Sequence, residues 1–432
     1  MLYRAVINTN KTGRLQARKV LLFAILFLFS LYIINVIGNL DGASVLLGKR
    51  RYLNVLWALL AIYLIVFRRE VEWSFFWERF SLVLPIFLVC IFLYFYHGRV
   101  FDLSHIKYVF LFILASSVIC KERKIGLRYF FTVNSISCLI IFFVAVYQMW
   151  VLKCPVPNGD INQNVFACFA AIIGNVSLFS VLYKNLGRRN RLLFSLCGIL
   201  AIWVALRTTC RTAYVTEVFL VGLLAFLACT KLKWSWRKAT IFLLSMAIVL
   251  LFLAVEGSSV TEWKFKAIPS EILNFLELGK NETTNTSVGL RLAMWKAAFT
   301  DLLPNHLCFG IGDVRELNLL GLISNSNIDK DFLKEMGHFH NEGVNVLVMG
   351  GLLLFIVSNW LLYRLFIIAK SESVLLCLLV AAVTWGMTEV AFYHKPVLIV
   401  FLSIWLLYEC AIRNERRNAV ESGRDSKNET VF

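Results

Sequence analysis

The chain has 432 residues, of which 59% are hydrophobic and 16% charged, and its mean hydropathy is +0.72. These values exclude an ordinary soluble globular protein, whose apolar share lies near ~45–50% and whose charged share lies near ~25%. The net charge of +17 would suit a nucleic-acid-binding protein. The basic residues, however, gather in short loops on one side of the predicted membrane spans, so we interpret them as topology signals.

Apolar runs long enough to cross a bilayer recur along the chain, and about twelve meet the requirement of ~20 apolar residues, although the second and fourth are short. They predict an all-α polytopic membrane protein with one large periplasmic loop that contains short helices. The runs lie near 20–38, 53–67, 80–96, 107–120, 129–151, 161–183, 192–206, 212–230, 239–255, 342–368, 373–391 and 396–412. The first lacks a small-residue cleavage site and is read as a retained helix.

The same pattern divides the chain into spans over 1–255, a large loop over 256–341, further spans over 342–412 and a tail over 413–432. The excess of Lys and Arg in alternate short loops predicts that both termini are cytoplasmic and the large loop periplasmic. The tail is polar, which is typical of a disordered segment. The 11 cysteines show no CxxC or zinc spacing, which argues against a disulfide or metal framework.

Polar residues near the predicted spans are the first candidates for function. The loop after the fifth span contains Asn162 and Asn164, which suit either a helix N-cap or a substrate contact. If the segment is helical, Arg207 and Arg211 share one helix face, because residues four apart are neighbours on a helix. Charges near a span usually have partners or functions, although Arg207 equally suits an interfacial arginine that extends toward the headgroups.

Two acidic residues, Glu217 and Glu389, fall within predicted spans. They suit counter-ions for the arginines, interhelical pairing or an indirect contact with a carrier lipid or acceptor, and we do not assign either as catalytic.

The large loop is too long for a simple connection and should contain structure of its own. Ser270 suits a short helix start, and 287–303 reads as an amphipathic helix ended by Pro304. Helical spacing predicts that Leu292, Trp295 and Phe299 pack against the membrane domain. Arg291 lies one turn from Trp295 and, for an arbitrary loop, would read as a surface residue covering that ring.

His338 and His340 lie just before the apolar run that begins near Gly343. In an extended segment their side chains would point to the same side. Zinc would require further ligands at suitable spacing, and the sequence offers no third candidate. Metal binding is therefore the least favoured of three interpretations, behind a structural pair of loop histidines and a catalytic role. A helix N-terminus beside them adds partial positive charge and suits a phosphate group.

These residues resemble the signature of the O-antigen ligase family, which includes O-antigen polymerases and O-oligosaccharyltransferases. His340-Asn341, then nine residues and Gly351, is similar to the family's histidine motif, although Leu354 stands where a further glycine is usual. Arg291, in the segment Gly-Leu-Arg-Leu-Ala-Met-Trp, resembles its loop arginine motif. Arg211 resembles the arginine of its membrane Thr-x-x-Arg pattern.

The resemblance implies transfer of a glycan from undecaprenyl diphosphate to lipid A-core at the periplasmic face of the bacterial inner membrane, in lipopolysaccharide biosynthesis. His340 would be the general base, and Arg211 and Arg291 would bind the diphosphate. Four residues would have supporting roles: His338, Arg207, Asn164 and Asn341. No metal, cofactor or nucleic acid is implied, and a single displacement would invert the anomeric centre.

Two alternatives remain open from the sequence. An O-antigen polymerase or O-oligosaccharyltransferase would use the same donor with a different acceptor. A secondary transporter would also have many spans, but such proteins tend to show two related halves, and no internal repeat is visible here.

Overall fold

The computed structural model describes residues 16–25, 49–98, 103–154, 156–158, 162–235, 237–238, 240–241, 244, 287–314 and 337–428. Within these ranges the chain forms helices and turns and no strand. The prediction of an all-α polytopic membrane protein is therefore confirmed. Parts of the first and ninth predicted spans, and the proposed helix start at Ser270, lie outside the described residues.

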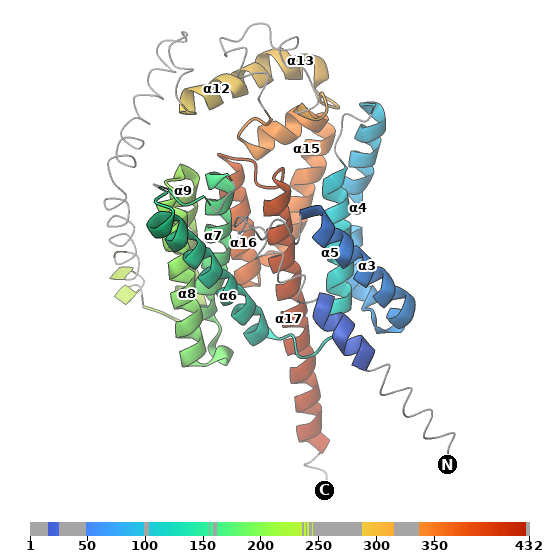
Figure 1. The fold of residues 1–432 in the computed structure, drawn as a ribbon, viewed down its shortest axis with the longest axis vertical. Helices are drawn as coiled ribbons and strands as arrows, with labels where there is room; N and C mark the ends of the chain where they lie inside the picture. The colour runs from blue at the N-terminus through green and yellow to red at the C-terminus, as the bar shows by residue number, and fades with distance from the viewer. Residues whose placement is uncertain are drawn as a thin grey trace.

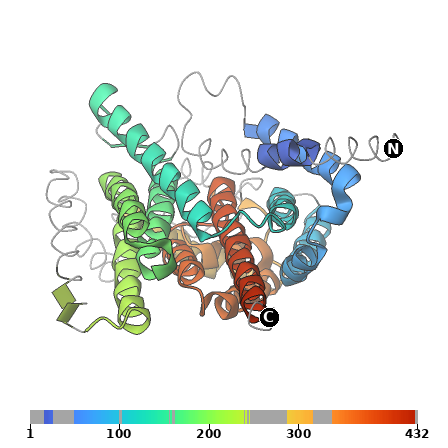
Figure 2. The same ribbon diagram turned by 90° about the horizontal axis from the view of Figure 1, so that it is seen from below.

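The helices form an upright bundle with two shorter elements across one end (Figure 1). The bundle helices are α3 (Lys49–Phe67), α4 (Trp73–Tyr96), α5 (Ser104–Ile119), α6 (Leu127–Val146), α7 (Gln163–Leu178), α8 (Arg188–Arg207), α9 (Arg211–Lys231), α15 (Glu342–Ala369), α16 (Ser373–Gly386) and α17 (Lys395–Asn428). Across the end lie α12 (Ser287–Ala297) and the short α13 (Leu303–His306). Helices α6 to α9 gather on one side of α17, and α3 to α5 on the other (Figure 2).

By length and apolar composition, 7 of the described helices can cross a membrane, and α5 and α16 are shorter apolar helices. The total of about twelve spans therefore stays a prediction. Pro85 lies inside α4. Aromatic residues mark both ends of this helix, with Trp73 and Trp77 exposed at one end and Tyr96 at the other, as in the aromatic belts of membrane proteins.

Helix α15 is broken at Gly351, which has φ 64° and ψ −162°. The segment 307–312 fills the break, because the amides of Ile311 and Gly312 donate to the carbonyls of Val348 and Met349 at 2.8 and 3.0 Å. On the other side of the break, the Leu352 amide donates to the Leu307 carbonyl at 2.8 Å. The backbone groups freed by the break are thus satisfied internally, as they must be in a membrane protein.

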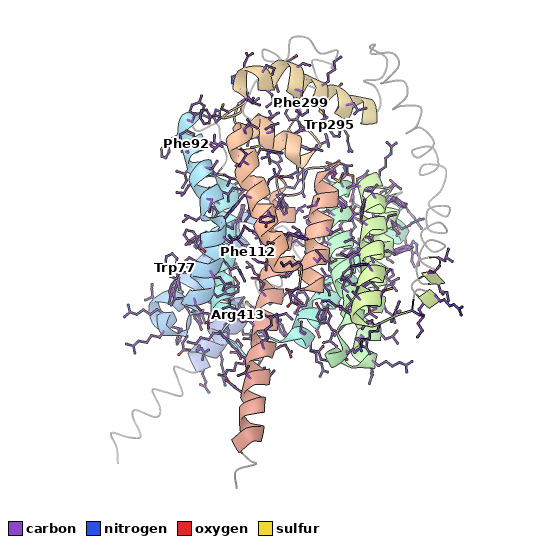
Figure 3. All side chains as sticks on the ribbon, turned by 180° about the vertical axis from the view of Figure 1, so that it is seen from behind. Trp77, Phe92, Phe112, Trp295, Phe299 and Arg413 are labelled. Carbon is purple, nitrogen blue, oxygen red and sulfur yellow. The ribbon has the colours of Figure 1, made fainter. Side chains whose placement is uncertain are left out.

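The α12 region differs in detail from its prediction. The helix ends at Ala297 and continues as a π-helical turn over 298–302, and Pro304 lies in the first turn of α13 rather than ending the long helix. Proline fits there because first-turn amides have no intrahelical partner. Phe299 is 54% exposed and does not pack as expected; Met294, Ala297 and Ala298 form the buried face instead. Figure 3 shows Trp295 and Phe299 at this end of the bundle.

The tail is not a disordered segment as far as the structure describes it, because α17 continues through Asn428. The extension projects from the bundle at the end opposite α12 (Figures 1 and 3). Three of its arginines, Arg413, Arg416 and Arg417, form ion pairs with Glu78, Glu372 and Glu72 respectively. These pairs stabilise the last helix past residue 412, where the hydropathy pattern ended it.

Candidate functional site

The centre of the candidate site is the carboxylate of Glu389, whose side chain is only 4% exposed. The η2 nitrogen of Arg291 donates to its Oε1 at 2.6 Å, and the amide of Asn164 donates to the same oxygen at 3.0 Å. The Nδ1 of His340 lies 3.0 Å from Oε2, and the Nε2 of His338 lies 3.9 Å from it. One carboxylate therefore gathers four of the residues that the sequence selected.

Glu389 lies in the turn 387–394, because α16 ends at Gly386 and α17 begins at Lys395. The expectation that Glu389 lies within a span is therefore wrong, whereas its role as a counter-ion for an arginine is confirmed. Burial alone would raise the pKa of Glu389, but the hydrogen bond from His340 and the charges of His340 and Arg291 outweigh burial and hold the pKa below its usual range. Glu389 is thus an anion at neutral pH.

Asn341 and Glu342 attach the turn 387–394 to the start of α15. Asn341 is the N-cap of this helix, since its Oδ1 accepts from the Val344 amide at 2.9 Å, and its Nδ2 donates to the Met387 carbonyl at 2.8 Å. The Glu342 carboxylate accepts from the Phe392 amide at 3.1 Å. The prediction that α15 begins at Asn341 and Glu342 is confirmed.

His340 has a left-handed backbone with φ 47°, which is uncommon for a residue other than glycine and concentrates at functional sites. The rings of His338 and His340 have centroids 4.3 Å apart, so the two side chains point to the same side, as expected. Because Nδ1 faces an ionised carboxylate, we assign the ring proton to Nδ1. In the neutral ring with this tautomer, Nε2 carries the lone pair, and the side chain is 28% exposed.

Arg291 reaches Glu389 from α12, which is anchored to the histidine segment. The indole nitrogen of Trp295, one turn further along α12, donates to the Phe339 carbonyl at 2.7 Å. Phe339 is fully buried between the two histidines. Arg291 therefore does not cover Trp295 as an isolated surface residue would.

Arg207 and Arg211 do not share one helix face as expected, because α8 ends at Arg207 and a new helix, α9, begins at Arg211. Arg207, the last residue of α8, lies over the ring of Trp203 with 6.0 Å between the guanidinium carbon and the ring centroid. Arg211 is the first residue of α9, and the next residue, Thr212, contacts the hydroxyl of Thr388 at 2.7 Å. The start of α9 is thus joined to the turn that carries Glu389.

Of the two roles that the sequence left open for the asparagines after the fifth predicted span, the structure shows the helix N-cap, and the substrate contact stays a prediction. Asn162 is the N-cap of α7 and accepts from the backbone amide of Asn164 at 2.8 Å. The side chain of Asn164 contacts Glu389. Glu217, the other acid, lies in α9 and accepts from the Asn175 side chain of α7 at 2.9 Å, which is interhelical pairing away from Glu389.

The structure supplies potential metal ligands that the sequence did not reveal. His338, Glu389 and His394 offer ligand atoms that all lie within 4.8 Å of one another, so the statement that no third candidate exists is wrong. Burial, together with the positive charges that His340 and His394 can carry, lowers the pKa of His338 to about 3. His338 is therefore neutral at physiological pH.

The site places the guanidinium of Arg291, the imidazole of His340 that Glu389 orients, and the neutral imidazole of His338 at one end of a membrane bundle. A guanidinium suits phosphate oxygens, and an imidazole fixed through Nδ1 can accept a proton at Nε2. Sequence reasoning missed the central position of Glu389. The signal available was an acidic residue at the end of an apolar run, but its partners are distant in the sequence.

Comparison with known proteins finds a related family and a related enzyme. Residues 196–358 match the family model described as O-antigen ligase, a range that includes Arg207, Arg211, Arg291, His338 and His340. The chain is also 23% identical over 308 residues to the O-antigen ligase of Escherichia coli (strain K12), covering 69% of each chain. Both comparisons support membership of the O-antigen ligase family. Together with the apolar helices, they indicate an integral membrane protein of lipopolysaccharide biosynthesis.

Proposed function

We propose that this O-antigen ligase family member transfers a glycan from undecaprenyl diphosphate to lipid A-core, with inversion at the anomeric carbon and without a metal ion. The observation that carries the proposal is the shared carboxylate of Glu389, which Arg291 contacts at 2.6 Å and His340 at 3.0 Å. A cation suited to phosphate and a candidate base are thereby held against the same carboxylate, and displacement of a diphosphate requires such fixed positions.

The donor would be bound through its diphosphate by Arg211 and Arg291. A guanidinium offers two parallel donors to phosphate oxygens. The leaving diphosphate gains negative charge in the transition state, so these contacts would strengthen as the glycosidic bond breaks. Arg207 and Asn341 would support the site indirectly, through the end of α8 and the cap of α15.

His340 would act as the general base through Nε2. The acceptor hydroxyl oxygen forms a bond to the anomeric carbon as the bond from that carbon to the diphosphate oxygen breaks. The hydroxyl proton passes to Nε2, and the electron pair of the broken bond leaves with the diphosphate. Glu389 would hold the ring in the required tautomer and stabilise the imidazolium that forms. His338, being neutral, would pack beside the base without repelling it.

The site would face the periplasm, with both termini in the cytoplasm. Supporting this orientation, Arg413, Arg416 and Arg417 lie in α17 after its apolar part, and this helix runs away from α12 to the opposite end of the bundle (Figure 1). Short basic segments favour the cytoplasmic side.

Purified protein supplied with the lipid-linked glycan and lipid A-core tests the proposal. His340→Ala should still bind the donor but lose on the order of 10²–10⁴ in turnover, while Arg211→Ala and Arg291→Ala should weaken donor binding as well as turnover. Transfer at near wild-type rate by correctly inserted His340→Ala would contradict the base assignment. Elongation of lipid-linked glycan with no transfer to lipid A-core would favour a polymerase.

A further inference from the structure

A line of buried threonines joins α9 to α16 and the turn that follows it. The hydroxyls of Thr212 and Thr388 lie 2.7 Å apart. One helical turn deeper, Thr384 contacts the hydroxyl of Thr216 at 3.2 Å. Thr212 is 3% exposed and Thr216 is fully buried, so neither α9 hydroxyl has ready access to water or headgroups.

The upper pair occupies a distinctive position in the sequence. Thr212 directly follows Arg211, and Thr388 directly precedes Glu389. Because successive Cα atoms are about 3.8 Å apart and a threonine hydroxyl lies close to its own Cα, this contact keeps the Cα atoms of Arg211 and Glu389 within about 15 Å of each other. That distance is within the combined reach of an arginine and a glutamate.

A second observation places the start of α9 near the same carboxylate. Cys210 immediately precedes Arg211. Burial raises the pKa of the Cys210 thiol, and the negative charge of Glu389 raises it further by a smaller amount. The electrostatic influence of Glu389 therefore extends to the residue beside Arg211.

We infer that the hydrogen bond between Thr212 and Thr388 is a positioning contact for the donor site: it fixes the first turn of α9, and with it Arg211, relative to the carboxylate that holds Arg291 and His340. Two cations that engage one diphosphate must keep a fixed spacing, because a misplacement of about 1 Å can cost on the order of 10²-fold in rate. The inference rests on the proposed function, in which Arg211 and Arg291 share the diphosphate.

The two threonines act through Arg211 and touch neither substrate nor the reacting atoms. They differ in this from the deeper pair, Thr216 and Thr384, which joins the same helices one turn further from the site. The upper contact should therefore affect donor binding and turnover, and its effect should require the Arg211 side chain.

Thr212→Val removes the hydroxyl and nearly preserves the shape. We expect kcat/KM for the undecaprenyl-diphosphate-linked glycan to fall about 3- to 20-fold, the range that corresponds to measured hydrogen bonds between membrane helices. Thr388→Val should have a similar effect, and the double variant should be no worse than either single variant. Thr212→Ser, which keeps the hydroxyl, should restore kcat/KM to near the wild-type value.

The decisive measurement repeats Thr212→Val in an Arg211→Ala background. If the contact acts through Arg211, the second substitution should change kcat/KM by less than about twofold, because non-additivity identifies residues that act as a unit. Thr230→Val is the matched control. Thr230 lies near the other end of α9, and its hydroxyl donates to the carbonyls of Phe226 and Leu227 in its own helix, so this variant should retain wild-type kinetics and thermal stability.

The outcomes separate the inference from the proposed function. If Arg211→Ala weakens donor binding while Thr212→Val has no effect, the inference is wrong and the donor assignment stands. A loss from Thr212→Val that is equally large in the Arg211→Ala background also overturns the inference. If Arg211→Ala leaves donor binding unchanged, the donor role of Arg211 and the positioning role of Thr212 and Thr388 are both wrong.

Discussion

Replacing Glu389 by glutamine removes one negative charge and leaves the shape of the side chain almost unchanged. Two charge-assisted contacts depend on that charge, from Arg291 at 2.6 Å and from His340 at 3.0 Å. An amide can also present its NH₂ group to Nδ1, which would favour the tautomer with the proton on Nε2 and remove the lone pair that accepts the acceptor proton. A positioned base contributes about 10²–10⁴ in rate.

We expect Glu389→Gln to lower turnover by about 10²–10³-fold, which corresponds to about 3–4 kcal/mol of activation free energy. Glu389→Asp keeps the charge but is one methylene shorter, so it should retain one contact and lose only about 10-fold. Initial rates of transfer by purified protein in lipid nanodiscs, at saturating donor, measure both effects.

Glu217→Gln is the matched control, because it replaces a buried acid of α9 whose hydrogen-bond partner is Asn175 of α7, away from Glu389. This variant should keep near wild-type turnover even if its thermal stability falls. Turnover of Glu389→Gln within about threefold of wild type, in protein that is inserted and folded, would refute the role of the shared carboxylate.

Three further predictions concern stability, architecture and metal ions. First, the pKa of His338 is about 6.5 in the unfolded chain and about 3 in the folded protein. Between these pH values the unfolded state binds more protons, so the free energy of unfolding should decrease as the pH falls. His338→Gln should therefore reduce the slope of the thermal midpoint against pH. Second, Gly351→Ala should destabilise the protein by several kcal/mol, because the added Cβ would clash with the Cys308 backbone at a left-handed residue. Gly222→Ala is the control: its new Cβ has nothing within 4 Å, so the variant should unfold at a temperature close to that of wild type. Third, transfer should survive EDTA; loss of activity on chelation that one added metal restores would contradict this.

Much of the helical fold could be predicted from the sequence, because hydropathy acts locally. The predicted spans over 129–151, 192–206 and 212–230 lie close to α6, α8 and α9. The pattern failed where a tertiary contact overrides local preference. Hydropathy cannot predict the break at Gly351, since the residues on both sides are apolar. The break depends instead on hydrogen bonds from amides of the segment 307–312, which is distant from Gly351 in the sequence.

The same limit explains the error at the C-terminus. The residues after 412 are polar and would be soluble as a disordered segment, and composition alone cannot distinguish that state from an exposed helix. Ion pairs from Arg413 and Arg416 to acidic residues elsewhere in the chain accompany the continued helix. Their partners, Glu78 and Glu372, are distant in the sequence.

The candidate site was partly predictable because its cations and histidines lie in short recognisable segments. His340 and Arg291 could be selected in this way, and Asn164 was selected with less support. The carboxylate that joins them could not, because its importance arises from four segments meeting in space. A lone glutamate after an apolar run is equally suited to interhelical pairing, and Glu217 has that role.

The surroundings of Glu389 favour an organic cation over a metal ion as its partner. A metal bound to this carboxylate at about 2.1 Å would lie roughly 5–7 Å from the Arg291 nitrogen that contacts it at 2.6 Å. At an effective dielectric constant of ~20, a dication and a guanidinium at that separation repel by roughly 5–7 kcal/mol. A metal held by His338, Glu389 and His394 would therefore have to displace Arg291. Because the proposed donor is itself bound by Arg291, such a metal should compete with catalysis rather than support it.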